Sequence, residues 1–347
     1  MKALKYLGPG DIGFRDVPIP DPVRGEVLIK VAACGVCHTD TSFRNNPELA
    51  LTPGLTLGHE ISGTVSRLGD CVQGFSPGTP VTVHTVWSCG SCRQCSAGRQ
   101  NACLSTGGRL KPAHGPGTRY DGGMAEFVVA PARALVATSG IDPVAAAVLP
   151  DAALVPYHSI HDAASLLTEG ASALVIGIGG LGQYAVSILS AVSPVRIIAV
   201  DNRDSALDAV RDSADVVFNS AVPDIEQRIL EAAGGYGPDV VLDLVGSTQT
   251  LDLATAVVAP YGTVRVPGQS NGTFTFETDR TTTSIPRGTT INRPYSGTYQ
   301  DLVDVVELAR AGRIGIDLQR YPFQEAVSAF DALDAGRVSG RAVLVMD

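Results

Sequence analysis

Hydrophobic residues in the N-terminal part of the chain recur in short runs that glycine and proline separate. Runs of this length, alternating or continuously apolar and bounded by turn residues, are typical of β-strands. The pattern predicts strands over residues 26–35, 61–69, 79–84 and 124–130. We therefore expect the chain to begin with an all-β unit.

The pattern changes to a helical one between residues 144 and 167, where Pro150 and Pro156 are expected to kink or split the helix. From Ala171 onward, apolar strands alternate with helical runs, which is typical of a doubly wound parallel sheet. The predicted strands cover residues 172–179, 196–201, 214–219, 239–246 and 262–268, and the clearest helices cover 181–192 and 224–235. The alternation ends near Thr290 with a last strand, a helix over 301–312 and a final strand–helix–strand.

Composition narrows the function classes. The 347 residues are 44% hydrophobic and carry a net charge of −9, which opposes binding to the phosphates of nucleic acid. No apolar run reaches the roughly 18 residues that a membrane span needs, and the start of the chain lacks the apolar segment of a signal peptide. We therefore expect a cytoplasmic protein whose seven cysteines are metal ligands or reduced core thiols.

Four of these cysteines lie close together, at Cys89, Cys92, Cys95 and Cys103. Four thiolates at such spacing suit a tetrahedral zinc ion with a closed ligand shell. The surrounding residues show neither a strand nor a helix pattern, so the metal is expected to form the core of an irregular lobe. Two neighbouring disulfides are the alternative, which the expected reducing compartment disfavours.

A glycine-rich turn, Gly177-Ile178-Gly179-Gly180-Leu181-Gly182, follows the strand predicted before it and opens a helix. In this context the glycines permit a tight turn, close approach of a pyrophosphate and packing of the helix on the strand. Asp201 ends the next strand, where a carboxylate binds the adenosine ribose and repels a 2′-phosphate, which favours NAD over NADP. A helix cap is the alternative role for Asp201, and Arg203 is a cation that could tolerate the extra phosphate.

A third motif joins Cys37-His38-Thr39-Asp40 to Gly58-His59-Glu60. Cys37 and His59 can supply two ligands to a catalytic zinc, which needs a third protein ligand and an open position.

Together these motifs, in this order, resemble the zinc-containing medium-chain alcohol dehydrogenases over the whole chain. The resemblance implies a GroES-like β-rich catalytic domain over residues 1–153, with a structural zinc lobe at 88–104. It further implies a Rossmann NAD-binding domain over 154–289 and a return to the catalytic domain over 290–347.

The resemblance also implies where the third catalytic ligand comes from. The family usually has a cysteine at the position that Asp151 occupies here, and aspartate at this position is similar to bacterial-type secondary-alcohol dehydrogenases. An Asp151 carboxylate keeps the charge of the ligand set and leaves the metal a competent Lewis acid. A capping or outer-shell role for Asp151 is the alternative.

Neighbouring residues match further family positions. Thr39 matches the residue that bonds the substrate oxygen and starts a proton relay, and Asp40 matches the carboxylate that orients a ligating histidine. Glu60 matches a glutamate behind the metal. Ser42 stands where many relatives end the relay in histidine, so the proton is expected to leave through the cofactor ribose to water or to His38.

The resemblance adds Val245 and Gly268 to the cofactor site. It places Phe43, Leu51, Trp87, Tyr295 and Ser296 around the substrate, with core packing as the alternative for the aromatic residues. Cys34 and Cys71 are expected to be buried apolar residues, and His84, His114, His158 and His161 to be structural or surface residues.

The expected function is reversible oxidation of alcohols, chiefly secondary ones, with hydride transfer to NAD and two zinc ions per chain. A polyol or sugar dehydrogenase is an alternative within the family, and a catalytically silent NAD- or zinc-binding protein is an alternative outside enzymes. The resemblance suggests a homodimer or homotetramer acting on a small molecule.

Overall fold

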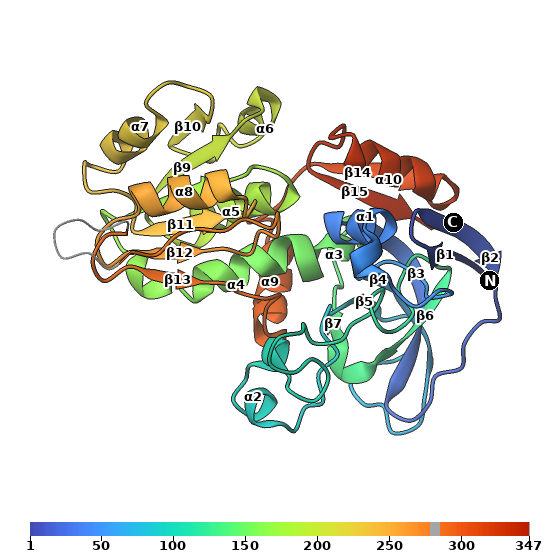
Figure 1. Cartoon of the computed structure of the whole chain (residues 1–347). Helices are drawn as coiled ribbons and strands as arrows, with labels where there is room; N and C mark the ends of the chain where they lie inside the picture. Colours follow the sequence, from blue (N-terminus) through green and yellow to red (C-terminus); the bar gives the residue numbers. More distant parts are fainter. Residues whose placement is uncertain (278–284, 347) are drawn as a thin grey trace. The chain divides into compact units, whose positions relative to one another are not determined.

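The computed structural model describes residues 1–277 and 285–346, which form two compact units (Figure 1). Unit 1 contains Met1–Leu154, Ser296–Gly312 and Asp317–Asp347. Unit 2 contains Val155–Tyr295 and Arg313–Ile316.

Unit 1 is built on a seven-stranded, mainly antiparallel sheet with the order β14-β15-β3-β4-β5-β7, and β6 pairs with β3. The long strand β3 (Glu26–Val36) pairs with β4 (Glu60–Leu68) along most of its length, with two register shifts. The other strands are β5 (Pro80–Val83), β6 (Phe127–Pro131), β7 (Leu135–Ala137), β14 (Leu318–Pro322) and β15 (Arg341–Val345). A separate hairpin joins β1 (Lys2–Gly8) to β2 (Asp11–Asp16).

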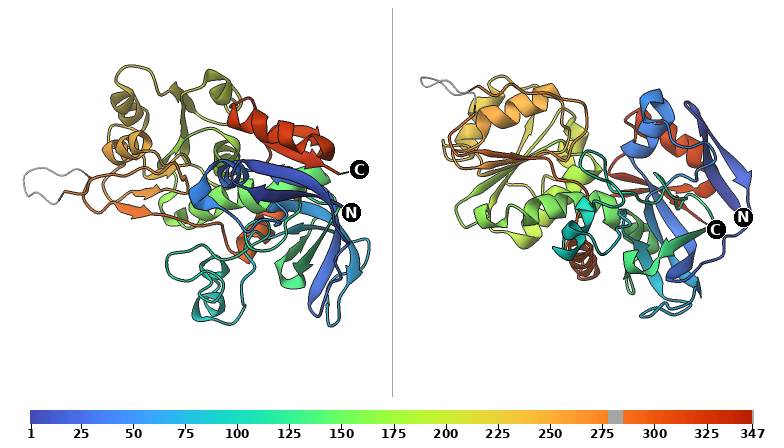
Figure 2. Two further views of the ribbon diagram at one scale, coloured as in Figure 1. Left: turned by 45° about the vertical axis from the view of Figure 1, so that its right-hand side comes forward. Right: turned by 60° about the horizontal axis from the view of Figure 1, so that its bottom comes forward.

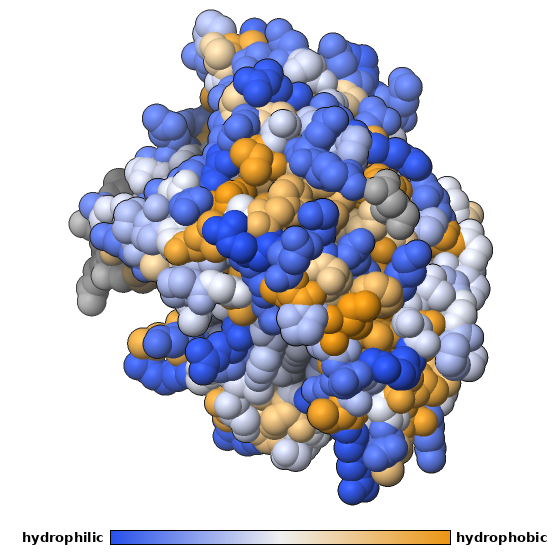
Figure 3. All heavy atoms as spheres, turned by 90° about the vertical axis from the view of Figure 1, so that its right-hand side faces the viewer, coloured by the Kyte–Doolittle hydropathy of each residue, from blue (hydrophilic) through white to orange (hydrophobic). Residues whose placement is uncertain are grey.

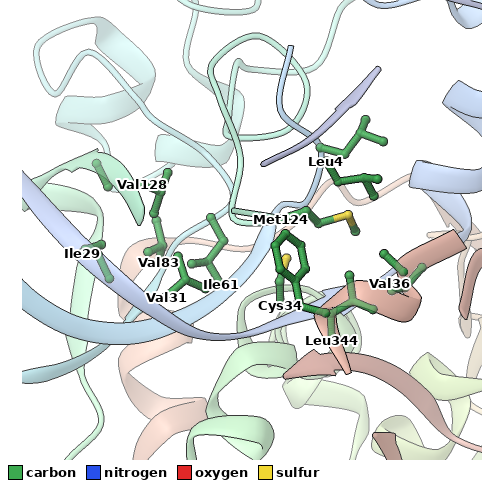
Figure 4. Packing of buried hydrophobic residues seen from close by; sticks show 14 of the residues in the cluster. Leu4, Ile29, Val31, Cys34, Val36, Ile61, Val83, Met124, Val128 and Leu344 are labelled. Carbon is green, nitrogen blue, oxygen red and sulfur yellow. The ribbon is translucent and has the colours of Figure 1, made fainter. Parts of the chain in front are cut away.

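The core of unit 1 contains branched aliphatic side chains from β3, β4, β5 and β15, together with Met124 and the aromatic residues Tyr6 and Phe330 (Figure 4). Cys34 is fully buried among them, as the sequence predicts. Cys71, in contrast, is exposed in a turn with φ 62°, so its predicted burial is wrong. Its place after β4, among the polar residues of a turn, explains the exposure, because no apolar face covers it.

Unit 1 also contains helices, one of which lies in a lobe apart from the sheet (Figures 1 and 2). They are α1 (His38–Asn45), α2 (Arg93–Ser96), α3 (Pro143–Val148), α9 (Tyr299–Arg310) and α10 (Ala326–Asp334). The helix α2 corrects the prediction that the four-cysteine segment is wholly irregular, and a 3-10 turn at Gln100–Ala102 adds to it. Both are single turns, too short to leave a periodic pattern in the sequence.

Unit 2 is a six-stranded parallel sheet with the order β10-β9-β8-β11-β12-β13, flanked by helices on both faces (Figures 1 and 2). Its strands are β8 (Ser172–Ile176), β9 (Arg196–Asp201), β10 (Val216–Asn219), β11 (Val240–Asp243), β12 (Thr263–Arg265) and β13 (Thr290–Asn292). Its helices are α5 (Gly180–Val192), α6 (Asp204–Asp208), α7 (Ile225–Ala232) and α8 (Thr248–Val257), and α4 (Leu154–His161) begins at the boundary with unit 1. This is the predicted doubly wound Rossmann sheet, and the mixed α/β fold class is confirmed.

The surface is of mixed polarity. On the face in Figure 3, apolar side chains are interspersed with polar ones, as on most folded proteins. Among the described residues, no helix is both long and apolar enough to span a bilayer.

Candidate functional site

Four potential metal ligands converge in unit 1: Cys37, His59, Glu60 and Asp151. One ligand atom from each lies within 4.8 Å of all the others. The Cys37 Sγ atom is 3.4 Å from Asp151 Oδ2, and His59 Nε2 is 3.9 Å from the same oxygen. The sequence-predicted trio of Cys37, His59 and Asp151 is thus brought together, although Cys37 and Asp151 are 114 residues apart in the chain.

Local backbone geometry places the first two ligands. Cys37 directly follows β3 and is the N-cap of α1, and its N–H donates to Asp40 Oδ2 at 2.9 Å. The fully buried Asp40 also approaches His59 Nδ1 with Oδ1, at 3.5 Å. Gly58 has φ +92°, and a Cβ atom there would lie 2.5 Å from Cys34 Sγ, so glycine is needed before His59.

Asp151 lies within a π-helical turn, Leu149–Ala153, between α3 and α4. Pro150 at the second position of this turn has no N–H, which favours a local change of hydrogen-bond register. The predicted interruption at Pro150 is therefore present, whereas Pro156 lies inside α4 without ending it. The π-turn brings the Asp151 carboxylate to the cluster, with 19% of its side chain exposed.

Arg341 is a buried cation at this site that the sequence analysis missed. It lies at the start of β15, 4% exposed, and donates through Nε to Glu60 Oε2 at 3.2 Å and through Nη2 to Glu60 Oε1. The same Nη2 is 2.7 Å from Asp151 Oδ2. One guanidinium thus bridges both carboxylates, as its forked geometry permits. The only sequence signal is a basic residue opening an apolar strand.

Burial and neighbouring charges set the protonation of the cluster. Burial lowers the pKa of His59, but the charge of Asp40 and hydrogen bonds with Asp151, Asp40 and Cys37 together outweigh burial and raise that pKa well above its ordinary value. Burial opposes ionisation of Asp151, yet His59 and Arg341 hold the pKa of Asp151 well below its usual range. Burial raises the pKa of Glu60 to about 8, although Arg341 opposes the shift.

The residues predicted for proton transfer lie on α1. Thr39 is exposed, with its Oγ1 3.6 Å from Cys37 Sγ. His38 is also exposed, and Ser42 is half-buried one turn further along. The Thr39 hydroxyl is therefore accessible beside the ligand cluster.

The predicted substrate-pocket residues differ in burial and belong to both units. Trp87 is 8% exposed and stacks on Tyr120 with ring centroids 5.1 Å apart, while Phe43 and Leu51 are half-buried. Ser296 is buried in unit 1, where its Oγ lies 2.9 Å from Thr85 Oγ1. Tyr295 belongs to unit 2 and is 38% exposed.

The second cluster holds the four sulfur atoms of Cys89, Cys92, Cys95 and Cys103, all within 4.8 Å of one another. Sγ of Cys95 is 3.9 Å from that of Cys89 and 3.5 Å from that of Cys92. Backbone N–H groups of Ser91 and Cys92 donate to the Cys89 sulfur. Hydrogen bonds from Ser105 and from these N–H groups lower the pKa of Cys89 to about 5, and burial raises that of Cys95 to about 11.

Both clusters have the donors and spacing that zinc requires. Zinc–sulfur bonds of 2.3 Å in a tetrahedron place sulfurs about 3.8 Å apart, close to the spacing of the four-cysteine cluster. With oxygen or nitrogen ligands the corresponding separations are about 3.4 to 3.6 Å, comparable with the distances from Asp151 to Cys37 and His59. Four thiolates form a closed set, whereas the Cys37 cluster opens to the exposed Thr39.

The glycine-rich turn of unit 2 follows β8 and opens α5. Gly177 has φ +90°, and a Cβ atom on Gly182 would lie 2.0 Å from the Gly177 carbonyl oxygen. Val245 closes over the turn, with Cγ2 2.5 Å from the ideal Cβ position of Gly177. A Cβ on Gly268 would collide with the Val245 carbonyl carbon at 2.3 Å, so the loops after β8, β11 and β12 meet. The remaining predicted glycine-turn residues, Gly179, Gly180 and Leu181, are half-buried at the N-terminus of α5.

This position is suited to a dinucleotide. From β8 the sheet of unit 2 grows toward β9 and β10 on one side and, after the chain crosses over, toward β11, β12 and β13 on the other. Ligands of such sheets bind at the carboxyl ends of the strands, beside the point between β8 and β11 where this order reverses. The N-terminus of α5 presents N–H groups to an anion there.

Asp201 has a structural contact that the sequence analysis did not anticipate. Its Oδ2 accepts the N–H of Ile178 in the glycine turn at 2.6 Å, and its Oδ1 accepts from Arg203 N at 2.9 Å and Nε at 3.3 Å. The side chain is almost fully buried, and α6 is capped by Arg203 rather than by Asp201. The alternative reading of Asp201 as a helix cap is therefore wrong. Arg203 lies beside the carboxylate with 46% of its side chain exposed.

Comparison with known proteins gives two family matches. Residues 23–140 match the alcohol dehydrogenase GroES-like domain, and residues 180–310 match the zinc-binding dehydrogenase family. An NAD-dependent alcohol dehydrogenase of Sulfurisphaera tokodaii is 32% identical over 99% of this chain and 100% of its own length. The D-arabinose 1-dehydrogenase (NADP(+)) of Saccharolobus solfataricus is also 32% identical, over 96% of this chain and 94% of its own.

Solved structures give the same result. The alcohol dehydrogenase of Aeropyrum pernix superposes with a TM-score of 0.89 at 30% identity, covering 99% of this chain and 100% of its own. An acetophenone reductase of Geotrichum candidum in complex with NAD superposes with a TM-score of 0.86 at 30% identity, covering 99% and 96%.

Proposed function

This chain belongs to the GroES-like, zinc-binding alcohol dehydrogenase family, and we propose that it oxidises alcohols reversibly with NAD at the Cys37–His59–Asp151 cluster. The observation that carries the proposal is the convergence of one thiolate, one imidazole and one carboxylate within 4.8 Å, beside an accessible hydroxyl. This donor set suits a zinc site with an open position.

The proposed role of each residue and cofactor follows from its chemistry. Zinc held by these ligands would supply Lewis acidity toward an alcohol oxygen, and NAD would supply a hydride acceptor. Thr39 accepts the proton of the substrate hydroxyl as it gives up its own, which leaves toward water or His38 on the same helix. Asp40 orients His59, and Arg341 restrains the Glu60 and Asp151 carboxylates.

We propose the second cluster, Cys89, Cys92, Cys95 and Cys103, as a structural zinc site, because four thiolates leave no open position. Unit 2 is proposed to bind NAD through the turn Gly177–Gly182, with Val245 and Gly268 beside it. The buried charge of Asp201 favours NAD, since it lies at the strand end where a 2′-phosphate would come.

Secondary alcohols are the proposed substrates. Phe43, Leu51 and Trp87, the candidate pocket residues of unit 1, are mainly apolar, which suits an alkyl or aryl substituent. The acetophenone named in one structural relative is a ketone, the product class of a secondary alcohol. Sugar oxidation is the second candidate, because a relative of equal identity is named for D-arabinose.

An assay of NADH formation with secondary alcohols, primary alcohols and sugars, each with and without a zinc chelator, tests the proposal. We expect the highest kcat/KM for a secondary alcohol and loss of turnover with chelator. Sugars as the best substrates would favour the second candidate. Tight NAD binding without turnover of any of these compounds would favour a silent binding protein.

A homo-oligomer in the cytoplasm completes the proposal. All three residues of the edge strand β13 are exposed, and Tyr261 and Phe276 of the same unit are 77% and 68% exposed. An exposed strand edge, in a unit that also exposes aromatic side chains, is suited to pairing with a second copy. Sedimentation analysis should give a dimer or tetramer, and a monomer at micromolar concentration would contradict it.

A further inference from the structure

The helix that carries the proposed proton-transfer residues is too short to hold its own position. Helix α1 has eight residues, and only Asp40 and Thr41 are buried. Isolated helices of this length are unstable in water, because nucleation is costly and few hydrogen bonds follow. With so little apolar surface, α1 depends on polar contacts at its two ends.

The N-terminal contacts lead directly to the ligands. Asp40 accepts the N–H of Cys37 and lies 3.5 Å from His59 Nδ1, so a shift of α1 displaces the surroundings of both ligands. The exposed Thr39 moves with the same turn.

The C-terminal contacts lead to α10. Arg44 donates through Nη1 to Asp331 Oδ1 at 2.8 Å and through Nη2 to Asp334 Oδ2 at 2.5 Å. Asn45 adds a hydrogen bond of 2.6 Å to the same Asp334 oxygen. The Arg44 guanidinium lies 5.4 Å from the ring centroid of Phe330, which is fully buried in the core of unit 1. The side chain of Arg44 is only 12% exposed, while those of its partners Asp331 and Asp334 are 58% and 30% exposed.

Helix geometry connects the two ends. Asp40 and Arg44 are four residues apart and so share one face of α1, and Asp331 and Asp334 are three apart on α10. Helices α1 and α10 contact each other in unit 1 (Figure 1). After α10 the chain continues to β15 and Arg341, which binds Glu60 and Asp151. The C-terminal segment therefore contacts α1 through α10 and the carboxylates of the cluster through Arg341.

We propose that Arg44, bound by Asp331 and Asp334 of α10, is a positioning residue that sets the place of Cys37 and Thr39 in the catalytic site. The inference rests on the proposed function. Bonds from Asn45 and Arg44 outweigh burial and lower the pKa of Asp334, so this carboxylate stays ionised and paired at neutral pH.

The test compares Arg44→Ala and Asp334→Asn with Arg67→Ala, which breaks the exposed Arg67–Asp21 ion pair of unit 1. Cobalt(II) loaded in place of the catalytic zinc reports the Cys37 geometry through its thiolate absorption band, independently of turnover. We expect both test variants to shift this band and to lower kcat about tenfold, as small misplacements of reacting groups do, with an unchanged KM for NAD. The double variant Arg44→Ala/Asp334→Asn should be no worse than Arg44→Ala alone. The control should resemble wild type.

Equal cobalt bands and equal kcat for Arg44→Ala and Arg67→Ala would overturn the proposal, as would additive losses in the double variant. If Arg44→Ala does not fold, the milder Asp334→Asn decides by the same readouts. Wild-type protein that gives the cobalt band but oxidises no alcohol would refute the proposed function, and the spectra would still decide whether Arg44 positions Cys37.

Discussion

The Asp151 carboxylate lies between a guanidinium and an imidazole, since its Oδ2 is 2.7 Å from Arg341 Nη2 and 3.9 Å from His59 Nε2. Asp151→Ala should lower catalytic zinc content and turnover together, with kcat falling at least about a hundredfold, because two remaining protein ligands hold zinc poorly. NAD binding to the separate unit should persist. Zinc content and kcat of Asp151→Ala equal to wild type would transfer the ligand role to Glu60, whose carboxylate lies in the same cluster.

Gly35 is tightly packed against the same cluster. A Cβ atom there would lie 1.9 Å from Glu60 Oε2 and 3.0 Å from Glu60 Cβ. Gly35→Ala should displace Glu60 from Arg341 and destabilise the protein by about 1–3 kcal/mol, as overpacking of a core does. Gly315→Ala is the matched control, since nothing lies within 4 Å of a Cβ at that position. Equal urea midpoints for the two variants would contradict this packing.

Asp201 combines a structural and a recognition role that substitution can separate. Asp201→Asn retains an oxygen acceptor for the Ile178 N–H but removes the charge, so kcat/KM should shift toward NADP. Asp201→Gly removes both the oxygen acceptor and the charge. Its kcat/KM for NAD should fall about tenfold or more, since a hydrogen bond to a charged group is lost. Steady-state kinetics with both cofactors measure the shift. Wild-type preference for NADP would reverse the role assigned to Asp201.

Residues with local signals could be predicted from the sequence, and residues defined by distant contacts could not. The cysteine and glycine motifs have fixed spacings, and the structure gathers each set in space. Arg341 acts on Glu60 and Asp151, 281 and 190 residues away, so no local pattern reveals it. Arg44 likewise reaches Asp331 and Asp334 across 287 and 290 residues.

Elements with clear periodicity were predicted well, and irregular ones were not. The five predicted strands of unit 2 all occur, with ends trimmed by a few residues. The π-turn at Leu149–Ala153 was read only as an interruption, because apolar residues continue through it without a change of pattern. Pro156 is tolerated as the third residue of α4, directly after the π-turn, where the hydrogen-bond register has just changed.

His84 joins two elements of unit 1 and makes their connection pH-dependent. The N–H of Val86 donates to Nδ1 at 2.9 Å, and Nε2 lies 3.1 Å from the carbonyl oxygen of Gly297, just before α9. These contacts require the neutral ring with its proton on Nε2. Burial lowers the pKa of His84 below its ordinary value of 6.5.

Because folding lowers the pKa of His84, the free energy of unfolding decreases as the pH falls. The unfolded chain binds a proton at its ordinary pKa while the folded chain resists it, so the stabilisation is complete above that pH and declines as the pH falls below it. His84→Gln removes the titration, so its free energy of unfolding should decline less between pH 7 and pH 5.5 than that of wild type. The difference in slope is at most about 1.4 kcal/mol per pH unit. Urea unfolding at several pH values measures it, and parallel slopes would contradict the prediction.

At the scale of the whole molecule, the alternation of strands and helices was enough to predict two kinds of sheet and their order along the chain. The parallel sheet of unit 2 and the mainly antiparallel sheet of unit 1 have the hydrophobic patterns expected of each. The predicted return of residues 290–347 to the catalytic domain came from the family resemblance, because β14 and β15 carry no signal for which sheet they join; unit 1 takes up Ser296–Gly312 and Asp317–Asp347.

The two metal clusters belong to different kinds of site and should differ in how readily they lose zinc. In the four-cysteine cluster four thiolates would complete the zinc shell and backbone N–H groups bond the sulfurs, so a chelator finds no open position at the metal. The Cys37 cluster has three proposed protein ligands and an exposed neighbour in Thr39.

Metal analysis of pure protein should find two zinc ions per chain. Brief chelation should remove one, with loss of turnover and little change in melting temperature, because that zinc is not the core of a lobe. Removal of the second zinc should need longer exposure to the chelator and should lower the melting temperature.

Cys37→Ser and Cys103→Ser show which zinc belongs to which cluster. Each variant should lose one zinc, and only Cys103→Ser should lose much stability. One zinc at full activity, or loss of both at the same rate, would contradict the distinction between an open and a closed site.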